Sequence, residues 1–183
     1  MGRRRSVLTS RVSGPRDAEE AAVGQVDVVE VLNDPLAQRL MAAAIPARLA
    51  YIAVDGTPRV VPIGFHWNGA EIVMATVPVS PKVSALRANP AVALTVDTND
   101  QPPNVLMVRG TARIHDVDGV PEEFLAGSRK LIRACDWDGF EAGVRALYTR
   151  MSVVTVTPTW AKVLDFETRL PDAVARLAAA HAR

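Results

Sequence analysis

The sequence predicts a small antiparallel β-barrel with helices at its rim. Short apolar segments rich in β-branched residues follow one another closely, which is typical of a small barrel or sandwich. The dipeptides Asp55-Gly56 and Asn68-Gly69 are tight-turn signals between such segments. Parallel strands need helical crossovers, and these are mostly missing, so we favour antiparallel pairing. At 183 residues the chain is long enough to bury a core as one domain.

The first half of the chain predicts one helix, three strands and a second helix. Leu36, Leu40, Met41 and Ala44 form one apolar face of a helix over residues 35–44, which Asn33 or Asp34 caps. The strands follow at residues 49–54, 59–67 and 71–77, with Pro58 suited only to a strand start or edge. Ser80 and Pro81 then begin a short helix that ends at Asn89-Pro90.

The second half adds strands at residues 91–97 and 105–115, helices at 121–134 and 140–151, and closing strands at 153–157 and 162–166. A final alanine-rich helix covers residues 171–182. We therefore divide the chain into a flexible N-terminal extension (1–30), the barrel domain (31–170) and a C-terminal helix (171–183).

Composition excludes several classes of partner. The net charge of +1 argues against bulk attraction to nucleic acid, and no apolar run approaches the ~20 residues of a membrane span. Cys135 is the single cysteine, so no intrachain disulfide forms, and we expect a cytoplasmic protein. Residues 1–16 carry five arginines and residues 17–30 five acids, which indicates a flexible, self-neutralising tail; a nucleic-acid arm is the alternative.

A candidate anion site lies at the start of the helix after Ser80. Backbone amides and the positive end of the helix dipole attract anions, and Lys82 adds a full charge. The chain has only three lysines, Lys82, Lys130 and Lys162, and one of them stands where a phosphate would bind. A solvated lysine at a helix start is the alternative interpretation.

The order of several short motifs resembles the flavin-binding split-barrel superfamily, which includes pyridoxamine-phosphate oxidase and deazaflavin-dependent reductases. The motifs are Arg59-Val60-Val61-Pro62, Ala75-Thr76, Ser80-Pro81-Lys82, Asn89-Pro90-Ala91-Val92-Ala93-Leu94 and Val108-Arg109-Gly110-Thr111-Ala112. Each motif alone is a weak signal, but five motifs in this order and at this spacing are a fairly strong one. The resemblance spans residues 36–166 and implies a mainly β, six-stranded antiparallel split barrel (the FMN-binding split barrel) with peripheral helices.

The resemblance also implies a homodimer with two cofactor sites at its interface. Arg59 and Lys82 would hold the cofactor phosphate, with Ser80 and Thr76 as hydroxyl donors beside Ala75. One strand would lie along the isoalloxazine ring and present backbone amides to its polar edge: Val60, Val61, Pro62, Ile63 and Gly64. Arg87 and Arg109 could add charge or simply face solvent.

The resemblance implies an oxidoreductase that moves hydride between bound FMN, or the deazaflavin coenzyme F-420, and a small molecule. A carrier or sensor that binds a flavin without turnover is one alternative, and a barrel that has lost the cofactor and acts in protein interactions is another. The oxidases proper end in an Arg-x-His motif, and the corresponding segment, residues 162–169, lacks that histidine. No catalytic residue is assigned, because the cofactor supplies the chemistry. His66, His115 and His181 form no ligand-spaced cluster, so no metal site is expected.

Overall fold

A computed structural model describes residues 28–181. Its first half contains, in chain order, α2 (Val28–Asn33), α3 (Pro35–Ala42), β1 (Ala47–Ile52), β2 (Pro58–Ile63), β3 (His66–Trp67), β4 (Ile72–Thr76) and α4 (Pro81–Ala88). Its second half contains β5 (Ala91–Asp97), β6 (Val105–Asp118), α5 (Glu122–Arg129), a 3₁₀ turn (Ala134–Asp136), α6 (Trp137–Leu147), β7 (Arg150–Leu164) and α7 (Asp172–His181).

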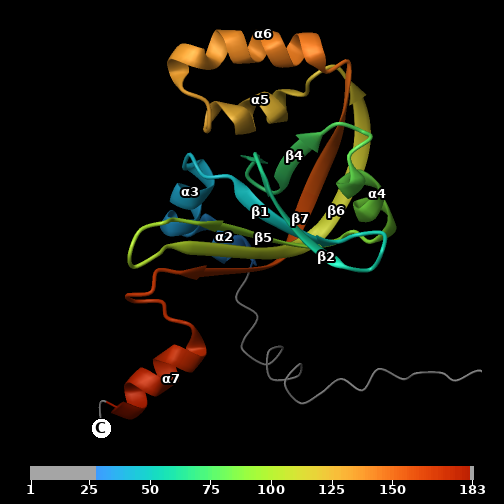
Figure 1. The fold of residues 1–183 in the computed structure, drawn as a ribbon. Coiled ribbons are helices and arrows are strands. Elements are labelled where there is room, and N and C mark those ends of the chain that lie inside the picture. The colour runs from blue at the N-terminus through green and yellow to red at the C-terminus, as the bar shows by residue number, and fades with distance from the viewer. Residues whose placement is uncertain (1–27, 182–183) are drawn as a thin grey trace, which may run out of the picture.

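The strands form one antiparallel sheet in the order β2-β1-β5-β6-β7-β4-β3 (Figure 1). Its two edge strands, β2 and β3, are consecutive in the chain and are joined through Gly64 and Phe65. The sheet therefore curls until its two edges are connected by chain rather than by a ladder of hydrogen bonds. This arrangement confirms the predicted mainly antiparallel β fold with peripheral helices, and its open seam agrees with a split barrel.

Helices close the two ends of the curled sheet. In Figure 1, α4 and α3 lie on opposite sides of the sheet. Leu86 of α4 and Leu36 and Leu40 of α3 are buried in the same core. Alternate residues of the strands fill the space between them, among them Leu49, Tyr51, Met74, Leu94, Leu106, Val154 and Val156. A second, smaller core of Leu125, Trp137 and Val144 joins α5 to α6, which lie together above the barrel in Figure 1.

Two predicted strand boundaries were wrong. Residues 59–67 do not form one strand: the chain leaves β1 after Ile63 and pairs with β4 from His66 onward. Residues 153–157 and 162–166 do not form two strands, because β7 runs unbroken past Pro158. The ladder between β6 and β7 shifts register where Arg109 faces Trp160 and Gly110 faces Pro158, and proline is tolerated at such a bulge.

The predicted helices are confirmed with changed limits. Asp34 caps α3 as expected, its carboxylate accepting the Leu36 amide hydrogen at 2.7 Å. The helix expected over residues 121–134 ends at Arg129, and the one expected over 140–151 begins at Trp137. Residues 28–30, which we placed in the N-terminal extension, form the first turn of α2; the rest of that predicted extension lies outside the described residues.

Candidate functional site

The start of α4 brings Ser80 and Lys82 together. Ser80 occupies the N-cap position, yet its side chain accepts no hydrogen bond from the first turn. Its hydroxyl oxygen accepts instead from the Lys82 ammonium at 2.9 Å. Burial lowers the pKa of Lys82 below its ordinary 10.5, and no carboxylate of the described residues pairs with it. The result is a half-buried cation beside an uncapped helix start, which is a suitable environment for an anion.

Arg59 reaches the same helix from another side. It lines a groove of about 520 Å³ together with Pro81 and Ser84 of α4. Its guanidinium is held by its own hairpin, however, with an ion pair to Asp55 at 2.9 Å and a short contact to Thr57. Lys82 does not line this groove, so the structure joins Arg59 to α4 without bringing the two predicted phosphate ligands into contact.

The predicted ring strand, residues 60–64, corresponds to most of β2 and the glycine after it. Strand β2 pairs only with β1, so one of its backbone edges is unpaired by any strand of the described chain. Val60 points outward with 65% of its surface exposed, whereas Val61 and Ile63 pack partly against the core. The strand therefore offers an open backbone edge and an exposed apolar side chain.

Ala75 and Thr76 end β4, and four residues separate them from the start of α4. They pair with Val153 and Ser152 of β7, Ala75 buried and Thr76 half-buried. The intervening loop exposes Val79 almost completely, at 88%. The predicted residues thus fall into two groups, one on β2 and one running from the end of β4 into α4.

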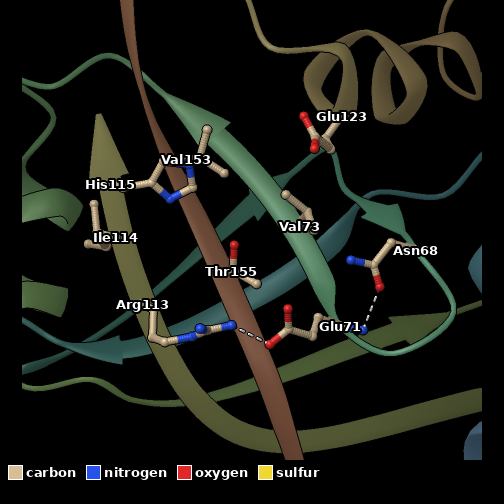
Figure 2. Close-up of a pocket in the computed structure, with 9 residues that line it drawn as sticks. All are labelled: Asn68, Glu71, Val73, Arg113, Ile114, His115, Glu123, Val153 and Thr155. Carbon is tan, nitrogen blue, oxygen red and sulfur yellow. Dashed lines mark hydrogen bonds and ion pairs between the residues drawn. The ribbon is translucent and has the colours of Figure 1, made fainter. Parts of the chain in front are cut away.

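A second groove was not anticipated from the sequence. Figure 2 shows it on the outer face of β4, β7 and β6. Its volume is about 480 Å³. The Glu71 carboxylate accepts from Arg113 at 2.6 Å and from the Thr157 hydroxyl at 2.7 Å. The Thr157 hydrogen bond, and next the charge of Arg113, hold the pKa of Glu71 below its ordinary value. His115 and Glu123 also line the groove. These residues come from separate elements, so no local sequence signal marks the groove.

The two other candidate arginines have partners outside the phosphate site. Arg87 pairs with Asp116 at 3.0 Å, and Arg109 lies over the Trp160 ring at 4.4 Å. Across residues 28–181, no group of His, Cys, Asp and Glu is arranged to hold a metal ion. Within the same range, no helix has the length and apolar character needed to cross a membrane.

Comparison with known families decides the identity of this fold. The sequence model of the pyridoxamine 5′-phosphate oxidase family matches residues 34–162, well over half of the chain. The chain belongs to that family of flavin-binding split barrels. No curated protein matches the sequence. The match covers both groups of predicted site residues and includes the split between β2 and β3.

Solved structures of the pyridoxamine 5′-phosphate oxidase fold agree with this assignment. An F-420 reductase is 25% identical with a TM-score of 0.53, and the alignment covers 68% of this chain and 94% of that one. General stress protein 26 from Bacillus anthracis is 15% identical with a TM-score of 0.52, covering 70% and 90% of the two chains. A conserved hypothetical protein from Mycobacterium tuberculosis is 18% identical with a TM-score of 0.50, covering 93% and 94%. The last two likenesses show the fold alone.

Proposed function

We propose that this protein is an oxidoreductase that binds FMN or the deazaflavin F-420 and uses it for hydride transfer with a small-molecule substrate. The observation that carries the proposal is the half-buried Lys82 ammonium, hydrogen-bonded to Ser80 at the uncapped start of α4. Family membership supports a cofactor of the flavin class. The likeness to an F-420 reductase at 25% identity supports deazaflavin as a candidate cofactor alongside FMN.

The residues at the start of α4 fit a phosphate. A cation removed from water gains more from a bound anion than a solvated one does, because screening is weaker. Lys82 donates to a neutral hydroxyl, which leaves its positive charge uncompensated within the described residues. Both cofactors carry a phosphate on a ribityl chain, so this site accommodates either one. Arg59 would join it by leaving Asp55, an exposed ion pair of the kind that contributes little to stability.

The open edge of β2 would hold the ring. Pro58 and Pro62 cannot donate to a ladder, so in an edge strand their nitrogens face the unpaired side. Val60 lies between them, two residues from each, and backbone amides of every second residue in a strand point to the same side. The Val60 amide is therefore expected to point to the unpaired side as well. We therefore assign the Val60 backbone N–H to the polar edge of the ring. The bound cofactor supplies the hydride chemistry, and this chain binds and orients it.

We also propose a homodimer that completes the cofactor site. Val60, Ala50 and Ala93 lie side by side in the register of β2, β1 and β5, on the face opposite the core. Val60 and Ala93 are exposed, and neighbouring Ile52 adds further apolar surface. Such a patch suits a subunit interface. Ala93→Arg should yield monomers by size-exclusion chromatography with light scattering, whereas Ala142→Arg on α6 should leave the assembly unchanged.

The first test is an absorbance titration of the purified full-length protein with FMN and, separately, with F-420. Tight binding of one cofactor with a shifted visible band supports the proposal. Turnover is tested next, by following reduction of the bound cofactor with NADPH, or its oxidation by candidate acceptors. Binding without any redox exchange would favour the carrier or sensor, and failure to bind either cofactor would refute the proposed function.

Oxidation of a vitamin B6 phosphate is tested separately. The family takes its name from pyridoxamine 5′-phosphate oxidase, but residues 162–169 of this chain lack the histidine of the Arg-x-His motif. We expect no oxidation of pyridoxamine 5′-phosphate by the flavin-loaded protein. Formation of pyridoxal 5′-phosphate, read by its absorbance, would contradict this expectation.

A further inference from the structure

The break between β2 and β3 is held from the α5–α6 side of the molecule. Phe65, the second residue of the break, is buried, with 1% of its surface exposed. Gly127 of α5 lies against its backbone so closely that a β-carbon there would approach the Phe65 carbonyl carbon and oxygen to 2.8 Å. The end of α5 therefore rests directly on the segment where the chain passes from one edge of the sheet to the other.

Lys130, at the C-cap of α5, connects three segments. Its ammonium lies 3.5 Å from the centroid of the Phe65 ring, a distance typical of a strong cation–π contact. It also donates a hydrogen bond to the Met41 carbonyl oxygen at 2.7 Å. That carbonyl is in the last turn of α3, where backbone oxygens lack intrahelical partners and a cation is favourable. One side chain thus ties α5, the break and α3 together.

The next residue extends this contact to the ring strand. The Leu131 Cδ1 atom lies 3.5 Å from the position of a β-carbon at Gly64, and Leu131 remains 37% exposed. Gly64 is the last residue of the strand assigned to the isoalloxazine ring. A displacement of α5 would therefore be passed directly to the backbone beside the cofactor.

We propose that Lys130 is a positioning residue for the cofactor ring: by holding Phe65 and α3 it fixes the Gly64–Phe65 break, and with it the end of the ring strand. The inference rests on the proposed function, because the strand carries a ring only if a flavin or deazaflavin binds. Burial also lowers the pKa of Lys130 to about 8, which agrees with an ammonium enclosed by the three segments. Lys130 does not touch the phosphate site, so its effect should fall on the ring.

The test compares Lys130→Met, Lys130→Gln and Lys130→Arg with wild type, and Lys162→Met is the matched control. Lys162 is a half-buried lysine paired with Asp172 at 3.2 Å, away from the break. With the cofactor that the wild type binds, K130M should raise the Kd less than about tenfold, since the phosphate contacts stay. Its visible band should shift toward that of free cofactor, and iodide should quench the ring fluorescence more strongly. K130R and K162M should keep the wild-type band.

A second measurement needs no cofactor. Hydrogen exchange of the peptide covering residues 61–67 should be at least about tenfold faster in K130M than in wild-type apoprotein, and unchanged in K162M. An unaltered band or unaltered exchange in K130M would overturn the proposal, as would equal changes in K162M. If K130M fails to fold, K130Q takes its place under the same criteria. If the wild type binds neither cofactor, the proposed function fails and the role toward a ring fails with it. Exchange then still decides whether Lys130 holds the break.

Discussion

Replacing Lys82 with methionine is the sharpest perturbation of the proposed phosphate site. Methionine keeps most of the length and apolar stem of lysine but removes the ammonium that donates to Ser80. A charge-assisted hydrogen bond is worth ~1.5–3 kcal/mol. Its loss should therefore raise the Kd for FMN by about 10- to 150-fold. Partial burial of Lys82 places the effect toward the upper part of that range, because the contact is less screened than one at an exposed lysine.

The assay pairs FMN with riboflavin, which has the same ring and no phosphate. Both are titrated into wild-type protein, K82M and the control K162M, at constant pH and ionic strength. K82M should lose affinity for FMN while its riboflavin affinity stays within about twofold of wild type. The preference for FMN over riboflavin should fall by the same 10- to 150-fold factor. K162M should match the wild type with both ligands.

Two results would refute the reasoning. If K82M weakened FMN and riboflavin equally, Lys82 would act through the fold and not through the phosphate. If it weakened neither, the phosphate would bind elsewhere, and the start of α4 would lose its assigned role. A melting midpoint for each variant separates these outcomes from simple unfolding.

Three further predictions follow from specific contacts. Arg59→Ala should weaken FMN binding by roughly tenfold. Asp55→Asn should leave FMN binding unchanged or tighten it, because it frees Arg59 from its ion pair. Tighter FMN binding by R59A would contradict this prediction. Gly127→Ala should destabilise the fold by ~1–3 kcal/mol in urea denaturation, because the β-carbon meets the backbone of the β2–β3 break. Gly139→Ala on α6, with no atom within 4 Å of its β-carbon, should be neutral or stabilising. The pKa of Lys130 is about 8 in the folded protein and 10.5 ordinarily, so the unfolded chain binds more protons between pH 8 and pH 10.5. The free energy of unfolding should therefore rise with pH across that window, and it should rise less in K130M.

Local signals in the sequence were sufficient for most of the sheet. The Asp55-Gly56 and Asn68-Gly69 turns are both present, with positive φ at each glycine. Strand limits were wrong where distant contacts decide them. The chain breaks after Ile63 because Phe65 is buried against Gly127, which lies 62 positions further along. Pro158 suggested a gap in the last strand, but a register shift against β6 accommodates it.

The candidate site divides in the same way. Ser80 and Lys82 are two residues apart on one helix start, so their pairing follows from local geometry and was accessible from sequence. The partner of Arg59 was also local, since Asp55 is four positions away, but the competition between that carboxylate and a phosphate was not foreseen. Lys130 gave no signal beyond the scarcity of lysine, because its contacts to Met41 and Phe65 join segments far apart in the chain.

The open edge of β2 also constrains how two copies can associate. An unpaired edge strand normally invites another strand to extend the sheet, which leads to aggregation. Pro58 and Pro62 remove two donors from that edge, so such an extension would lack hydrogen bonds there. The exposed side chain of Val60 instead belongs to the outer face of the sheet, which continues through Ala50 and Ala93. A partner subunit is therefore expected to pack on this face and leave the edge of β2 to the cofactor. Because we propose that the partner completes the cofactor site, Ala93→Arg should weaken cofactor binding together with dimerisation.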